Sequence, residues 1–272
     1  MAASHTTRPA AVAGLFYPGT AAALAHDIRD LLAGGQPPAL PAPPKALIVP
    51  HAGYIYSGPI AASAYALLTP LRAVVRRVVL LGPVHRVPVR GLALPGVEAF
   101  ETPLGSVAVD TGLVAQLAAL PQIITSRAAH AQEHSLEVQL PFLQQALDRF
   151  TLLPLAVGDA TAEEVAQVLD MLWGGDETLI VISSDLSHYL PYEQARRIDA
   201  ATCAAIGRLD DQLGHEQACG GTPINGLLRA ARRHHLRAHL LDLRNSGDTA
   251  GDRGRVVGYA AFAFTTETGH GH

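Results

Sequence analysis

The chain has 272 residues, of which 49% are hydrophobic and only 16% are charged, and its formal net charge is −4. This composition supports a large core, and no block of like charges indicates a nucleic-acid or anionic-membrane surface. No apolar run approaches the roughly 20 residues of a membrane-spanning helix, and the first residues lack the apolar stretch of a secretory signal. Two cysteines are too few for a secreted disulfide scaffold, so we expect a cytoplasmic protein.

Short apolar segments alternate with helical patterns along the chain. A first helix is expected at 20–33, where apolar residues recur at helical spacing before two glycines, and a proline-rich connector follows it. Further helices are expected at 57–68, 110–120, 136–147, 161–172, 196–209 and 222–231. Strands are expected at 46–49, 78–81, 92–94, 107–109, 152–157, 179–182, 240–243 and 256–264.

This alternation predicts the class of fold. Strands interleaved with helices are typical of an α/β protein in which a mixed, largely parallel central sheet is covered by helices on both faces. No linker divides the chain after the proline-rich connector, so we expect a single domain over 1–272. Its core is expected at about 12–264, with flexible tails at 1–11 and 265–272.

Several chemically active side chains follow the predicted strands. His51, His85 and His188 each come shortly after an apolar strand, and ligands of open α/β sheets bind at the carboxyl ends of strands. His134 stands before a predicted helix. Cys219 lies in a glycine-rich turn that opens another helix, a position that lowers the pKa of a thiol and suits a metal ligand. We therefore expect these residues to converge on one site.

Each residue also has a structural interpretation. A single histidine after a strand is more often a hydrogen-bonded loop residue, and Asp185, after the strand at 179–182, is a possible helix cap. Cys219 alone is more often a small buried hydrophobic residue. Their joint placement after several strands favours the functional interpretation over the separate structural ones.

Taken in order, the motifs resemble the Memo family, of the type called AmmeMemoRadiSam system protein B. The resemblance covers about 12–264, and the ordered set is specific although each piece alone is not. The motifs are Ala-Gly-Leu-Phe-Tyr17-Pro, Pro-His51-Ala-Gly-Tyr, Gly-Pro-Val-His85, Glu-His134-Ser-Leu-Glu-Val, Ser-Ser-Asp185-Leu-Ser-His188, Cys219-Gly-Gly-Thr-Pro-Ile, Ser246-Gly-Asp248 and Gly-Tyr259-Ala-Ala.

The resemblance implies a fold and a metal site. Members of the family resemble class III (LigB-like) extradiol dioxygenases, which implies a three-layer α/β/α domain. Those dioxygenases hold non-haem Fe(II) with two histidines and a carboxylate. The implied ligands here are His51 and His85, with Cys219 in place of the carboxylate and Asp185 and His188 beside the metal. Because a thiolate is a soft donor, we expect one metal ion, with iron or copper favoured over zinc.

The implied function is a metal-dependent oxidoreductase related to non-haem iron dioxygenases, acting on an unknown small molecule or peptide. His188, held by Asp185, is the expected proton-transfer group, and His134 is a second candidate. The residues expected to line the pocket are Tyr54, Tyr56 and Glu133.

Two other functions remain open at this point. One is a non-enzymatic adaptor that binds a metal or a peptide in the same pocket, and the other is a zinc hydrolase with a water on the metal. The resemblance also implies AMMECR-type and radical SAM proteins of the same pathway as partners. Neither a nucleic acid nor a membrane is expected as a partner.

Overall fold

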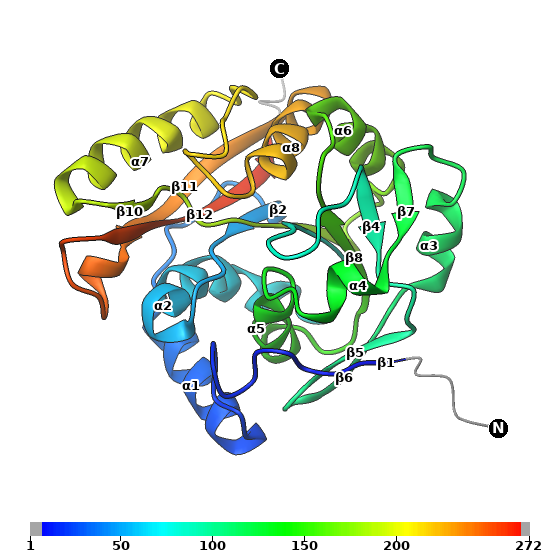
Figure 1. Cartoon of the computed structure of the whole chain (residues 1–272), viewed down its shortest axis with the longest axis horizontal. Helices are drawn as coiled ribbons and strands as arrows, with labels where there is room; N and C mark the ends of the chain where they lie inside the picture. The colour runs from blue at the N-terminus through cyan, green and yellow to red at the C-terminus, as the bar shows by residue number, and fades with distance from the viewer. Residues whose placement is uncertain (1–6, 268–272) are drawn as a thin grey trace.

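A computed structural model describes residues 7–267, and a nine-stranded mixed sheet runs through its centre (Figure 1). The strand order is β10-β12-β2-β9-β3-β8-β4-β7, and β11 also pairs with β12. The strands are β2 (Pro44–Val49), β3 (Arg77–Pro83), β4 (Leu92–Leu94), β7 (Ile123–Thr125), β8 (Thr151–Val157), β9 (Thr178–Ser183), β10 (His188–Leu190), β11 (Leu236–Asn245) and β12 (Val256–Thr266).

The centre of this sheet is parallel. β2 pairs with β9, β9 with β3, and β3 with β8, all in parallel, whereas β12 joins β2 in antiparallel orientation. The central strands are continuous apolar segments without alternation, because both of their faces are buried. The predicted central mixed sheet is confirmed, with its antiparallel pairs outside the parallel centre.

Helices cover both faces of the sheet, so the fold has three α/β/α layers (Figure 1). The helices on one face are α1 (Ala21–Gly34), α2 (Tyr54–Tyr65) and α5 (Leu140–Ala146). Those on the other face are α3 (Thr111–Leu117), α6 (Ala162–Met171), α7 (Tyr192–Gly207) and α8 (Gly221–Arg233). Each set of helices packs a separate hydrophobic cluster against the sheet, as the predicted single α/β domain requires.

Smaller elements complete the fold. A second sheet has the order β1-β5-β6. The remaining elements are β1 (Thr7–Arg8), β5 (Ala99–Thr102), β6 (Gly105–Ala108), α4 (Arg127–Ala131) and the 3-10 helices at Ala66–Leu71, Glu137–Gln139 and Ser246–Asp248. None of the helices within 7–267 is long and apolar enough to cross a bilayer.

The folded part of the chain is longer than the expected core of 12–264. Thr7 and Arg8 pair with β5, and Arg8 is buried. At the other end β12 continues to Thr266, which pairs with Leu236 of β11. Both extensions arise from pairing with distant strands, which local composition does not reveal. Residues 1–6 and 268–272 of the expected tails lie outside the described residues.

Candidate metal centre

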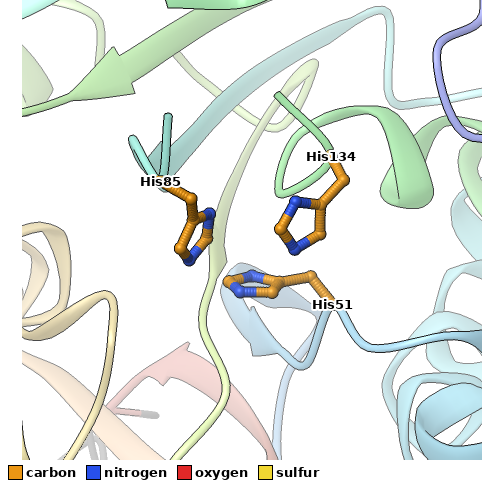
Figure 2. A group of neighbouring side chains, drawn as sticks. All are labelled: His51, His85 and His134. Carbon is orange, nitrogen blue, oxygen red and sulfur yellow. The ribbon is translucent and has the colours of Figure 1, made fainter. Parts of the chain in front are cut away.

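Three histidine rings meet at the carboxyl end of the parallel centre (Figure 2). His51 follows β2 and His85 follows β3, and both strands flank β9, which is followed by Asp185. His134 comes from the loop between α4 and the 3-10 helix at Glu137–Gln139. One ring nitrogen from each of the three histidines lies within 4.8 Å of one from the others. The sheet topology therefore brings together side chains that are far apart in sequence.

Hydrogen bonds fix which nitrogen of His51 carries the proton. Nδ1 lies 2.9 Å from the hydroxyl oxygen of Ser183, whose single proton goes to the carbonyl of Ser135. The amide nitrogen of Gln139 donates to the same hydroxyl and to the carbonyl of Pro50. Only a lone pair of Ser183 remains for the ring, so Nδ1 of His51 must donate and Nε2 is left unprotonated.

A buried carboxylate orients His85. Glu133 accepts the backbone N–H of His85 at 2.6 Å, and its other oxygen lies 2.8 Å from Nδ1 of the ring. Burial alone would raise the pKa of Glu133, but these bonds and the N–H of Ser135 outweigh it and lower the pKa to about 2. Nδ1 of His85 therefore donates to a charged carboxylate, which leaves Nε2 for a metal, as in carboxylate–histidine–metal arrangements.

His134 completes the group. Its ring stacks on that of His85 with centroids 4.7 Å apart, and Phe16 packs against it at the same distance. Burial lowers the pKa of His134 to about 4, with a smaller opposing effect from Glu133. Burial also lowers the pKa of His51 well below its usual value, and the neighbouring histidines add to that effect. Both rings are therefore neutral at pH 7 and carry the lone pairs that a metal needs.

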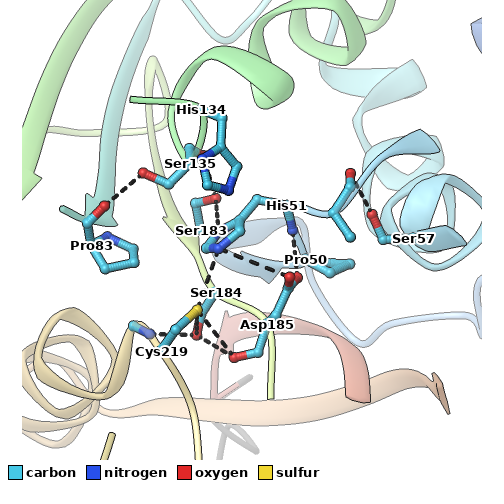
Figure 3. Close-up of polar contacts among 12 residues, drawn as sticks. Pro50, His51, Ser57, Pro83, His134, Ser135, Ser183, Ser184, Asp185 and Cys219 are labelled. Atoms are coloured by element: carbon cyan, nitrogen blue, oxygen red, sulfur yellow. Dashed lines mark hydrogen bonds and ion pairs between the residues drawn. The ribbon is translucent and has the colours of Figure 1, made fainter. Parts of the chain in front are cut away.

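Cys219 lies beside His51 (Figure 3) and is not a member of the three-histidine cluster. Its Sγ is 3.3 Å from Nε2 of His51 and 3.8 Å from the hydroxyl of Ser184. The expectation of a lowered thiol pKa is wrong: burial, reinforced by Asp185, raises the pKa of Cys219 to about 12. Removal from water outweighs the helix N-terminus here.

Asp185 does not hold His188 as expected. Its carboxylate accepts the backbone N–H of His51 at 2.7 Å, and it lies 4.0 Å from Nε2 of the same ring. Burial raises the pKa of Asp185 to about 7, against the effect of that hydrogen bond. His188 lies on β10, and its ring lines the cavity above the histidines. Asp185 therefore shapes the His51 loop, and His188 faces the cavity without it.

A cavity of about 770 Å³ opens over the three histidines. Tyr56 lines it as expected, but Tyr54 does not, because its ring packs in the core against Phe142 and its hydroxyl donates to the carbonyl of Val138. Glu133 is also absent from the wall and instead supports His85 from behind. The cavity is large enough for a small organic ligand.

A buried ion pair ties the N-terminal segment to this site, and sequence reasoning missed it. Arg8 contacts Glu137 at 2.7 Å and donates to the carbonyls of His130 and Glu133. The carboxylate of Glu137 also accepts two backbone N–H groups within 11–12. This arrangement of Arg8 and Glu137, called the clamp below, therefore fixes the loop that carries His134. The sequence signal for this ion pair was only the Glu-His-Ser-Leu-Glu motif, which ends at Glu137. Its partner Arg8 lies more than a hundred residues away in sequence.

The family match and the sequence relatives agree with the motifs of the chain. A crystal structure of uncharacterized protein JW3007 from Escherichia coli K12 has a TM-score of 0.48 and 16% identity, covering 80% of this chain and 98% of that one. A MEMO1 family protein of Aquifex aeolicus is 38% identical, covering 94% of this chain and 98% of its own length. A MEMO1 family protein of Archaeoglobus fulgidus is also 38% identical, covering 93% and 97%. The family description "Memo-like protein" matches residues 8–263, and the chain belongs to that family.

Proposed function

We propose that this protein is a metal-dependent oxidoreductase that binds one iron or copper ion and acts on a small organic molecule in the cavity. His51, His85 and His134 are the proposed ligands, with the sulfur of Cys219 as a fourth donor. The observation that carries the proposal is the pair of fixed tautomers. Ser183 and Glu133 each hold Nδ1 of a histidine and leave Nε2 available beside the third ring.

The donor set supports the choice of metal. Imidazole suits iron, copper and zinc alike, whereas a thiol beside the imidazoles favours softer ions. The thiol of Cys219 is protonated when no metal is bound, and a coordinated thiol loses its proton to the metal's charge. A redox-active metal held there would supply one-electron chemistry toward dioxygen, which is the oxidant we propose.

The remaining residues have roles at the substrate. His188 faces the cavity from β10 and is the proposed proton-transfer group, since burial lowers its pKa and keeps the imidazole neutral as a base. Tyr56 contributes to the cavity wall. A cytoplasmic location and contact with AMMECR-type and radical SAM proteins belong to the same proposal, and they rest on family resemblance and on two unpaired cysteines.

One observation favours a second candidate. Three histidines and an open position form the ligand set of catalytic zinc sites that activate a water molecule. A zinc hydrolase is therefore the alternative if zinc is the native ion, with His188 as the base for the bound water.

Metal analysis of protein purified anaerobically under reducing conditions tests the proposal. We expect about one iron or copper per chain, lost in His51→Ala, His85→Ala and His134→Ala. The matched control is His239→Ala, because His239 lies on β11, where its ring is hydrogen-bonded to Thr265 of β12, away from the cluster. Zinc at one per chain would select the hydrolase, and absence of any metal would reject both. Oxygen consumption by the reduced, metal-loaded protein separates an oxidoreductase from a binding adaptor.

A further inference from the structure

Tyr189 occupies a strained position at the rim of the cavity. Its φ is +60°, in the left-handed region that a bulky side chain rarely adopts. It lies at a register shift between β10 and β12, where His188 pairs with Val257 and Leu190 with Val256. Bulges of this kind redirect a side chain, often next to an active site. The conformation places a tyrosine ring, 61% exposed, on the cavity wall.

Arg255 lies over this ring. Its guanidinium carbon is 5.1 Å from the ring centroid of Tyr189, and its side chain also lines the cavity. Within 7–267 the guanidinium of Arg255 makes no ion pair and no hydrogen bond. A guanidinium resting on a ring face keeps its N–H groups directed outward, and those groups suit a planar anion.

A second free cation lines the same cavity. Arg86 follows His85 directly, and the described part of the chain offers it no carboxylate partner either. The exposed acid on the wall is Asp252, whose carboxylate accepts the N–H of Gly254. The other carboxyl group in the lining, Asp185, is buried and accepts the backbone N–H of His51. At the rim, two arginines therefore face one exposed carboxylate, and the remaining single positive charge matches a monoanion better than a dianion.

The walls below this rim are aromatic. Phe16, Tyr56 and Tyr259 line the cavity together with Tyr189, and the volume of about 770 Å³ accommodates a ring. Aromatic side chains offer flat apolar surface to a planar ligand. The cavity thus combines a surface for a ring with a positive rim for an anion, directly above the three histidines.

We propose that the cavity binds a small aromatic carboxylate, with Arg86 and Arg255 holding the carboxylate and Tyr189 contacting the ring. This assignment rests on the proposed function where it names the substrate class of the metal site. The binding itself rests on the rim alone and does not require the metal. The two arginines determine specificity for the anionic group of the ligand. The bulge between β10 and β12 positions Tyr189 to contact the ring of the ligand.

The test uses the metal-free full-length protein, so that a carboxylate cannot be held by a metal. Ligand-observed NMR titrations compare benzoate with benzamide, which has the same shape and no charge. We expect millimolar binding of benzoate, and binding of benzamide weaker by about fivefold or more. Arg86→Gln and Arg255→Gln should each weaken benzoate by about fivefold and leave benzamide unchanged.

Two further variants separate recognition from structure. Arg253→Gln removes the same charge two residues from Arg255, but Arg253 stacks on Tyr192 and does not line the cavity, so benzoate binding should not change. Tyr189→Gly adopts a positive φ without strain, so the fold should remain while both probes lose affinity. Unchanged benzoate binding in Tyr189→Gly would overturn the ring contact.

The outcomes distinguish this inference from the proposed function. Equal binding of benzoate and benzamide to the wild type would overturn the inference. So would benzoate binding that appears only after metal is added and ignores both arginine variants. Charge-dependent binding supports the rim whatever the metal content. If metal analysis of the protein as purified also finds no metal, the rim is supported and the proposed metal function is rejected.

Discussion

The sulfur of Cys219 lies 3.3 Å from Nε2 of His51, the nitrogen that the bond to Ser183 leaves without a proton. The thiol is therefore placed to donate to the lone pair that a metal would use. If His51 holds a metal through Nε2, the sulfur of Cys219 would be near enough to act as a further donor, and it would then influence which ion is retained. The first prediction follows from this contact.

Replacing Cys219 with serine removes the soft donor and leaves three imidazoles. We expect Cys219→Ser to keep a metal site but to lose about tenfold or more in copper(I) affinity, with a smaller effect on zinc. Anaerobic competition with a chromophoric chelator measures both affinities. The control is Cys203→Ser, since Cys203 lies on the buried face of α7 and should affect stability without changing metal binding. Equal copper(I) affinity in wild type and Cys219→Ser would exclude the sulfur as a donor.

The carboxylate behind His85 should tune metal binding. Glu133→Gln keeps the size of the side chain but removes the charge that fixes Nδ1 of His85, so metal affinity should fall by about 10–100-fold. The same chelator titration measures the change. Glu163→Gln on the surface of α6 serves as the control, because its partners are Arg229 and Arg233. A Glu133 variant with wild-type affinity would show that His85 needs no carboxylate.

The clamp between Arg8 and Glu137 should be costly to break. Glu137→Leu leaves a buried guanidinium without its counter-charge, and we expect a loss of about 3–5 kcal/mol in the free energy of unfolding. Urea denaturation of the metal-free protein measures it. Asp148→Ala breaks the exposed pair with Arg72, for which about 0–1 kcal/mol is expected. If the two losses were similar, the buried pair would not stabilise the N-terminal segment.

Stability should fall in mild acid, partly through His130. Burial lowers the pKa of His130 to about 4, while the unfolded chain titrates near 6.5. Below pH 6.5 the unfolded state binds the extra proton first, so stability is complete above that pH and declines as the pH falls toward 4. One such histidine accounts for at most about 3 kcal/mol.

The contribution of His130 is separable from that of the site histidines. His51 and His134 also have lowered pKa values and add to the same slope. His130→Gln should therefore flatten the dependence of unfolding free energy on pH between 6.5 and 4 without abolishing it. Urea titrations of the metal-free protein at several pH values give both slopes. Identical slopes in wild type and His130→Gln would show that His130 does not titrate on unfolding.

Local patterns predicted most of the helices and strands, because the apolar residues that become buried recur at the spacing of a helix or form short apolar runs in a strand. The capping box at Thr161 and Glu164 starts α6 as expected, and strands such as β3 extend only slightly beyond the predicted residues. Short edge strands such as β7 and β10 were not predicted, because their half-buried and exposed residues give no apolar run, whereas the equally short but fully buried β4 was predicted. Their pairing depends on neighbours that only the folded chain supplies.

The sequence predicted the parts of the candidate site that follow the ends of strands. It did not predict the parts that depend on how deeply a side chain is buried. His51 and His85 follow from the rule that ligands bind after parallel strands. Tyr54 was misplaced because α2 begins three residues before the expected start, which turns that ring into the core. The thiol pKa of Cys219 was misjudged because a helix N-terminus is visible in sequence, whereas burial is not.

The position of β12 has a consequence for how the chain folds. It is the final strand within 7–267, yet it lies inside the sheet between β2 and β11, where Phe262 pairs with Ile48. During synthesis, one hydrogen-bonding edge of β2 stays open until β12 has emerged. Contacts of such high sequence separation slow folding, and an open apolar edge invites pairing with other chains. Until β12 pairs with β2, the nascent chain therefore exposes an unpaired strand edge of the kind that promotes aggregation.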